Sequence, residues 1–317
     1  MSRPAGPWSG WWMVFVLLAL NIMSLVDRNI INMLVVPIQR DLHITDVQMG
    51  LVLGPVFAIA YLVCGLPFGW AADRYPRRVV IFVGSMIWSA ALTVGGFAKG
   101  FPGLVMSRAF VGAGEAALSP TAFSLIGDGL PRSRMTTALA LYSMGPKLAQ
   151  AAAFLIGGWL IGYAAHNSLI VPLIGELTSW RLVLFTIGAP GLFLSLLVFT
   201  FSEPDRKGSK TSDHPAPPIM PFLKSEWRLI TLLLLGAAAA GVMYATMLAW
   251  LPTFMTRKFG WEPPQFGPVL FWVGVVGAFS VIVKGMIVDW LGKRGMTDAP
   301  LRFYSWLIAI AVPATLI

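Results

Sequence analysis

Charged residues inside apolar stretches are the part of this sequence with the clearest chemical potential. Asp27 and Arg28 lie together in the first such stretch, and Arg108 and Glu115 lie in a later one. An ionisable side chain within a bilayer costs about 2.5 to 3.5 kcal/mol on insertion scales, so it persists only where it is paired or hydrated. A carboxylate beside an arginine can alternate there between ion pairing and protonation, or it can form a static ion pair. Both interpretations stay open at this point.

Helical spacing gathers these residues on polar faces. At 3.6 residues per turn two stripes form, Asn21, Ser24, Arg28 and Asn32 in one segment and Arg108, Gly112, Glu115 and Ser119 in another. A third stripe holds Ser143, Lys147 and Gln150. With a rise of about 1.5 Å per residue, Asp27, Glu115 and Lys147 all fall near the middle of a bilayer. We therefore expect one shared cavity, in which Lys147 either meets an anionic group of a ligand or neutralises Glu115.

Nine apolar segments carry these polar faces. They span residues 11–36, 47–71, 79–98, 103–129, 135–163, 180–201, 227–252, 265–288 and 301–317. Each is close to the roughly 20 residues that cross a bilayer as a helix, and longer than the strands of a membrane barrel. With 57% hydrophobic and only 12% charged residues, the chain has too little polar surface for a soluble protein. The fold class is therefore all-α membrane.

Basic residues lie mainly in the loops between these segments. Fourteen fall in one set of alternate loops and five in the other. Since cytoplasmic loops retain Lys and Arg, this asymmetry predicts an inner (plasma) membrane protein with a cytoplasmic amino terminus, membrane lipid around it and no nucleic-acid partner. The longest loop, rich in Pro and charge, predicts a cytoplasmic linker at 202–224 between a six-helix bundle at 1–201 and a second bundle at 225–317.

One spaced motif occurs twice. Its first copy recurs 216 positions later, so that Gly69, Asp73, Arg77 and Arg78 match Gly285, Asp289, Lys293 and Arg294. A collinear repeat of this kind indicates two similar halves with a site between them at mid-membrane. The same offset sets Ile317 against Phe101, where the fourth segment begins. We expect the second half to hold only helices seven to nine, so that the chain covers about nine of twelve helices.

The sequence GWAADRYPRR at 69–78 resembles the signature that the major facilitator superfamily carries between its second and third helices. In physical terms, Gly69 permits close helix approach and Asp73 can lie at the positive end of a neighbouring helix. Arg74, Arg77 and Arg78 can hold the loop at the cytoplasmic face. We interpret this set and its repeat at 285–294 as a cytoplasmic gate motif; a positive-inside anchor without gating is the alternative.

Further segments narrow the resemblance to the bacterial spinster-like branch of that family. They are VDRNIINMLVVPIQRDL at 26–42, SRAFVGAGEAALSPTAFSLIGD at 107–128 and LYSMGPKLAQAAAFLIGGWL at 141–160. The branch associates proton-linked conformational change with an acidic residue and Arg in the first helix and with Arg and Glu in the fourth. These match Asp27, Arg28, Arg108 and Glu115 here. Lys147 departs from the pattern, because relatives usually carry an uncharged residue there.

The resemblance implies the major facilitator fold of two six-helix bundles and a secondary active transporter that works by alternating access. It also implies Asp27 and Glu115 as proton carriers and a lipid-like or amphipathic organic substrate. The polar stripes add candidate substrate or charge-pair residues: Arg28, Arg108, Lys147, Asn21, Ser143 and Gln150. An organic anion and proton symporter is the alternative within transport, and a non-transporting receptor or sensor is the alternative outside it.

Signatures of enzymes are missing from the sequence. Metal-ligand spacings, nucleophile elbows, phosphate loops and dinucleotide fingerprints do not occur, and His43, His166 and His214 are scattered over loops. We therefore expect no enzymatic activity, no metal and no cofactor, with a small-molecule or lipid-like substrate and protons as the partners.

The loop charges make the first testable prediction, which concerns topology. Arg132 and the linker should face the cytoplasm, while Arg40 and Arg257 should face outward. Single cysteines at these positions, treated with a reagent confined to the outside, should be labelled at 40 and 257 and spared at 132. Labelling at 132 with protection at 40 would show the inverted topology.

Overall fold

The computed structural model describes residues 7–166, 169–171, 175–206 and 219–294, together with 296, 302–303, 305–306 and 309. Several side chains within these ranges are outside the described part, among them those of Arg132, Lys147, Asp289 and Lys293, and so are the surroundings of Gly285. The centre of the predicted linker and most of the ninth predicted segment, 301–317, also lie outside the described residues.

Helices account for each of the first eight apolar segments. In chain order they are α1 (Pro7–Met33), α2 (Val35–Leu42), α3 (Asp46–Leu53), α4 (Pro55–Arg74), α5 (Arg77–Gly95), α6 (Phe101–Glu115), α7 (Leu118–Gly129), α8 (Arg132–His166), α9 (Ser179–Leu196) with a 3-10 turn (Leu197–Thr200), α10 (Ile219–Ser225), α11 (Trp227–Phe259) and α12 (Pro263–Lys293). Within the described residues, seven helical spans are long and apolar enough to cross a membrane. The all-α fold class is confirmed.

Two of the predicted continuous segments are divided. Between α3 and α4 the chain turns at Gly54, and Pro55, which has no backbone N–H to donate, begins the second helix. Between α6 and α7 the turn at Ala116 and Ala117 tightens, with the Ala117 N–H donating to the carbonyl of Gly114. Hydropathy could not predict these breaks, since the segments stay apolar through them.

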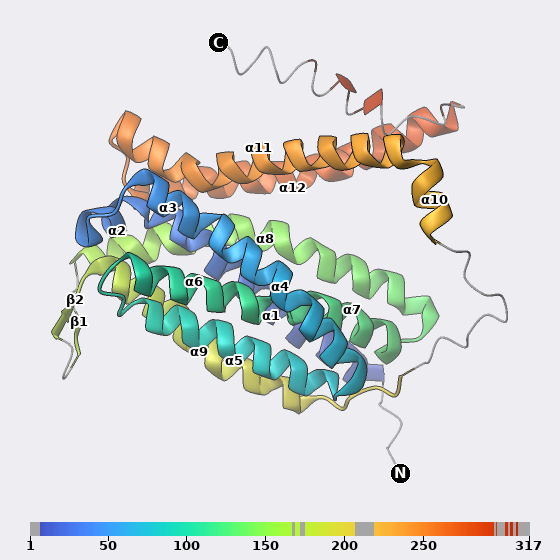
Figure 1. The fold of residues 1–317 in the computed structure, drawn as a ribbon, viewed down its shortest axis with the longest axis horizontal. Helices are drawn as coiled ribbons and strands as arrows, with labels where there is room; N and C mark the ends of the chain where they lie inside the picture. The colour runs from blue at the N-terminus through green and yellow to red at the C-terminus, as the bar shows by residue number, and fades with distance from the viewer. Residues whose placement is uncertain are drawn as a thin grey trace.

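A small β-hairpin is the other addition to the predicted fold. Strands β1 (Leu169–Val171) and β2 (Gly175–Leu177) pair antiparallel, with Leu169 opposite Leu177. The hairpin, α2 and the junction between α11 and α12 lie together at one end of the molecule (Figure 1), which we call the hairpin end. The end where α4 meets α5 and α10 begins is the linker end.

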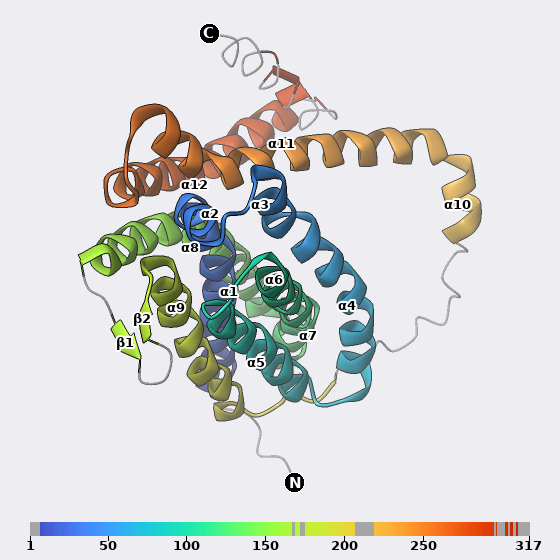
Figure 2. The same ribbon diagram turned by 60° about the vertical axis from the view of Figure 1, so that its left-hand side comes forward.

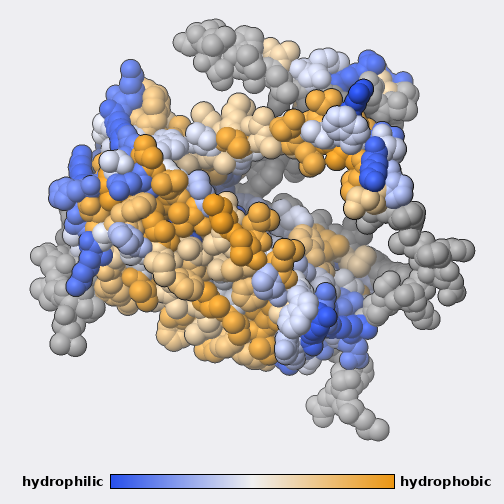
Figure 3. Space-filling view, viewed as in Figure 1, coloured by the Kyte–Doolittle hydropathy of each residue, from blue (hydrophilic) through white to orange (hydrophobic). Residues whose placement is uncertain are grey.

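The first six spans form one bundle, and α11 and α12 lie across one side of it (Figures 1 and 2). Helix α1 runs through the bundle and packs against α8, α7 and α9, while α5 packs between α6 and α9. The core includes Trp88 and Trp180, both fully buried. Apolar side chains cover the middle of the visible surface and polar ones gather at its two ends (Figure 3), as expected for a surface that faces lipid between two aqueous phases.

Glycines set the closest helix contacts. At the crossing of α5 and α6, a Cβ added to Gly114 would lie 2.5 Å from the carbonyl oxygen of Gly84 and 2.7 Å from the Trp88 nitrogen. Helix α12 approaches α8 in the same way, because a Cβ on Gly267 would lie 2.6 Å from the Phe154 carbonyl oxygen. Small residues at membrane helix interfaces allow this approach, and with it dense van der Waals packing.

The Gly114 crossing makes the second prediction. Gly114→Ala forces a methyl group against two backbone atoms of α5, so it should destabilise the fold by about 1 to 3 kcal/mol, the usual cost of overpacking. Gly127→Ala on α7 is the matched control, since a Cβ there meets nothing within 4 Å. Thermal unfolding in detergent should show a lower midpoint for Gly114→Ala alone. Equal midpoints would contradict the close crossing.

Candidate functional site

The four charged residues singled out in the sequence lie together between α1 and α6. Arg28 Nη2 donates to Glu115 Oε2 in an ion pair that joins the two helices. Arg108 Nη2 donates to the backbone carbonyl of Arg28 at 3.4 Å. The Glu115 side chain is 1% exposed and that of Arg28 is 37% exposed, so only one member of the pair is open to its surroundings. The charged residues predicted to share a cavity therefore lie together, with one arginine at the open side of the cluster.

Aromatic rings of α4 cover the arginines. The Arg28 guanidinium carbon lies 4.4 Å from the centroid of the Phe57 ring and 5.7 Å from that of Tyr61, and the Arg108 guanidinium carbon lies 5.1 Å from Phe57. A ring face attracts a cation at such distances, and the attraction grows as water is removed. Phe57 thus holds both arginines beside the carboxylates, a role that no sequence motif indicated.

Asp27 differs from its neighbours in having no partner within the described part of the chain. Its side chain is fully buried, and neither carboxylate oxygen accepts a hydrogen bond from a described residue. A buried charge without a partner is costly, whereas a protonated carboxyl group is neutral. Asp27 can therefore exist here in a neutral form at little electrostatic cost, next in sequence to an arginine that pairs elsewhere.

The remaining predicted substrate residues do not join this cluster through hydrogen bonds. Asn21 Nδ2 donates to the Tyr142 carbonyl at 3.4 Å, which ties α1 to α8. Gln150 Oε1 accepts from the Tyr244 hydroxyl at 3.0 Å, which ties α8 to α11. Ser143 is exposed on α8, and the Lys147 side chain lies outside the described residues. Asn21 thus acts in helix packing, and Gln150 bridges the bundle to α11.

At the linker end, the gate motif centres on Arg77. Its side chain is 1% exposed and binds four groups: the carboxylates of Asp128 and Glu203, the Ser124 hydroxyl at 2.9 Å and the Pro204 carbonyl at 2.7 Å. Arg77 therefore bonds to partners inside the protein, because a buried guanidinium needs partners for its five donors.

The other motif residues surround this network. Arg78 donates to the Phe201 carbonyl at 2.8 Å, and Arg74 stacks on Trp70 with 4.3 Å between its guanidinium carbon and the ring centroid. Arg206, which the motif did not include, donates to the carbonyls of Ala72 and Tyr75. The first copy of the motif is thereby fastened to the start of the linker.

Two motif residues make none of the contacts expected of them in the described structure. Asp73 is exposed, and no hydrogen bond or ion pair joins it to another described residue. A Cβ on Gly69 would meet nothing within 4 Å, so no described helix approaches there. In the second copy, Arg294 lies with its guanidinium carbon 3.7 Å from the Trp290 ring centroid. The side chains of Asp289 and Lys293 and the surroundings of Gly285 are outside the described part.

Comparison with known proteins bears on this arrangement. The model of the family described as Major Facilitator Superfamily matches residues 17–317. Protein spinster of Drosophila melanogaster is 28% identical over 92% of this chain and 48% of its own length. A D-galactonate transporter of Escherichia coli O6:H1 is 27% identical over 87% of this chain and 66% of its own.

A solved structure is similar as well. It is a bacterial homolog of the human lysosomal transporter Spinster, in an inward-facing and unoccupied conformation. It is 26% identical, has a TM-score of 0.78, and is matched over 93% of this chain and 64% of its own. The chain thus spans no more than about two thirds of the length of these relatives.

The Arg77 network makes the third prediction. Arg77→Ala leaves Asp128 and Glu203 without their buried cation, so it should destabilise the fold by about 3 to 5 kcal/mol, the usual cost of breaking a buried ion pair. Arg74→Ala, which removes a cation stacked on an exposed ring, should stay within about 0.5 kcal/mol of the parent. Unfolding of both variants in one detergent checks this. Equal stabilities of the two variants would contradict the conclusion that Arg77 holds the linker end together.

Proposed function

The chain belongs to the major facilitator superfamily and is a multi-pass membrane protein, and from this we propose that it is a secondary active transporter. Members of such folds move substrate by rocking two bundles around a site near the bilayer midplane. Tyr244 and Arg257 of α11 bond to the first bundle, so part of a second bundle lies against it. The spinster-like resemblance, supported by the relatives above, carries the assignment to its branch.

Proton coupling is the mechanism that the charged cluster supports best. The observation that carries it is the contrast between Asp27, buried without a described partner, and Glu115, which pairs with Arg28. If Glu115 binds a proton, Arg28 is released; if it loses the proton, it recaptures the arginine. Asp27 is the adjacent acceptor, so the two carboxyl groups can hold a proton in different states of the cycle. Transport then follows the proton gradient.

For the substrate we favour a lipid-like or amphipathic organic molecule. The half-exposed Arg28 beside Phe57 and Tyr61 offers a cation and apolar rings in one place. An anionic head group and an apolar body fit that combination. A soluble organic anion is the second candidate, since Arg28 alone could bind its carboxylate and a D-galactonate transporter is among the relatives. For location we propose the inner membrane, with the amino terminus and linker in the cytoplasm, on the loop charges.

The fourth prediction tests the two carboxyl groups. Asp27→Asn and Glu115→Gln keep the side-chain shape and abolish titration, so they should retain counterflow exchange and lose accumulation driven by a pH gradient. The assay uses proteoliposomes with a lysophospholipid or D-galactonate as substrate, normalised to folded protein. Asp41→Asn is the control, because that carboxylate binds Trp180 and Arg181 at the hairpin end.

Four outcomes are distinguishable in this assay. Exchange of the lysophospholipid alone supports the amphipathic substrate, and exchange of D-galactonate alone supports the organic anion. Full accumulation by both variants, with reduced stability, would mean that the pair is static and would remove the proton-carrier role. If neither the parent protein nor Asp41→Asn exchanges either compound, both substrate classes are contradicted.

A further inference from the structure

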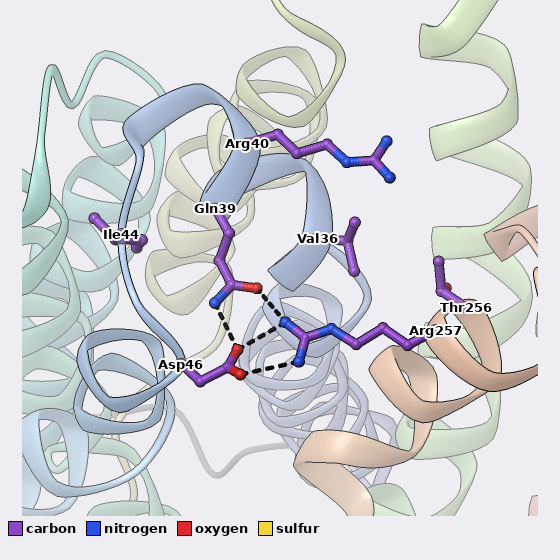
Figure 4. A pocket seen from close by; sticks show the side chains of 7 residues that line it. All are labelled: Val36, Gln39, Arg40, Ile44, Asp46, Thr256 and Arg257. Atoms are coloured by element: carbon purple, nitrogen blue, oxygen red, sulfur yellow. Dashed lines mark hydrogen bonds and ion pairs between the residues drawn. The ribbon is translucent and has the colours of Figure 1, made fainter.

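An ion pair at the hairpin end crosses from the first bundle to α11. Arg257 binds Asp46 through two parallel contacts, Nη2 to Oδ1 at 2.7 Å and Nη1 to Oδ2 at 3.0 Å. Gln39 completes a triangle, since its amide oxygen accepts from Arg257 at 2.9 Å and its amide nitrogen donates to Asp46 at 2.8 Å (Figure 4). Two-pronged arginine pairs of this kind fix geometry as well as charge. We call Gln39, Asp46 and Arg257 the latch.

Local structure presents each member of the latch. Helix α2 ends at His43 in the left-handed conformation, and Thr45 and Gln48 form a capping box that begins α3. These turns bring Gln39 and Asp46 onto the same side. Asp46 lies in the first turn of α3, and Arg257 lies in the last turn of α11 before Gly260 ends the helix. The negative charge of Asp46 is stabilised by the amino end of its helix, and the positive charge of Arg257 by the carboxyl end of its own. Each charge is therefore stable there without its partner.

The two charged side chains of the latch are exposed to solvent, so water can solvate each of them when they separate. The Arg257 and Asp46 side chains are 48% and 54% exposed, and a cavity of about 620 Å³ opens beside them. Beneath the latch the interface is closed, because Thr253, one turn earlier on α11, is only 3% exposed. Towards the linker end α11 leaves the bundle, where Met243 and Met247 are exposed and Figure 3 shows an open space. Contact between the bundle and α11 is thus concentrated at the hairpin end.

We infer that the latch is a positioning device of the transport cycle: it holds the hairpin end closed while the linker end is open, and it must break for the hairpin end to open. This inference rests on the proposed transport function. In alternating access each closed side needs contacts that exist in one state only. An exposed, two-pronged pair between the bundle and α11 has that property, whereas the buried Arg77 network lies within the first bundle and the adjoining start of the linker.

The experiment measures opening directly, without substrate or gradient. In a Cys64→Ala background, Thr253→Cys reports exposure of the interface under the latch to an impermeant maleimide. The reagent is applied from the side that labels Arg40→Cys in the same background. Asp46→Asn and Arg257→Gln should each speed labelling of position 253 about two- to fivefold, as expected from losing an exposed ion pair. The double variant should label no faster than the faster single variant, because one interaction is lost in all three.

Controls separate this result from other causes. Arg40→Gln removes a neighbouring cation of the same cavity that makes no hydrogen bond to the latch (Figure 4), so it should leave the rate unchanged. Gln39→Ala keeps both charges of the ion pair, so it should give a smaller increase in the labelling rate of position 253. It also tests the latch if a charge variant is poorly folded. Unchanged labelling in folded latch variants, or an additive double variant, would overturn the latch. Neither outcome depends on which substrate moves or whether protons drive it.

Discussion

The exclusion of charge from the bilayer interior is the constraint on which this structure depends. Every buried ion must find a partner within the protein, because lipid offers none. Glu115 meets Arg28 across two helices, and Arg77 binds two carboxylates, a hydroxyl and a carbonyl. These contacts fix how the helices are rotated and how far each is shifted along its axis. Asp27 is the exception in the described structure, and an exception of that kind is where a titrating function is best sought.

Close helix packing is what makes such pairing reachable. A Cβ on Gly112 would lie 2.5 Å from the Phe57 carbonyl oxygen, so only glycine lets α6 approach α4 this closely. That approach brings the Phe57 ring against Arg28 and Arg108, which themselves lie beside Glu115. The small residue and the charged residues on α6 are therefore parts of one arrangement. A larger side chain at position 112 would therefore displace Phe57, whose ring contacts both arginines, rather than a charged residue.

Sequence alone predicted the fold class, eight of the nine helical segments within the described residues, and the charged residues that lie together between α1 and α6, because these depend on hydropathy and on helical periodicity. It did not predict the division at Gly54, where one helix ends and Pro55 begins the next although hydropathy would continue a single helix, or the contact of Phe57 with the arginines. Asp128 and Glu203 were missed as partners of Arg77, since they follow it by 51 and 126 positions. Pairing across helices depends on rotation and register, which an apolar pattern leaves undetermined. One feature of the sequence could have indicated Asp128, because its carboxylate lies at the end of the apolar segment 103–129.

The two ends of the molecule differ in how their charges are held, and the difference has mechanical meaning. At the linker end Arg77 is buried and joins α5, α7 and the start of the linker, all in or next to the first bundle. Breaking it would strand several buried polar groups, so this end of the bundle should move as a unit. At the hairpin end the pair between Asp46 and Arg257 is exposed, and water can replace each partner at modest cost. In the proposed rocking motion, the Asp46–Arg257 pair is the ionic contact between the bundle and α11 that must break, whereas the Arg77 network moves with the first bundle. The close contact of α8 with α12 near Gly158 and Gly267 can then serve as the surface on which the two parts turn.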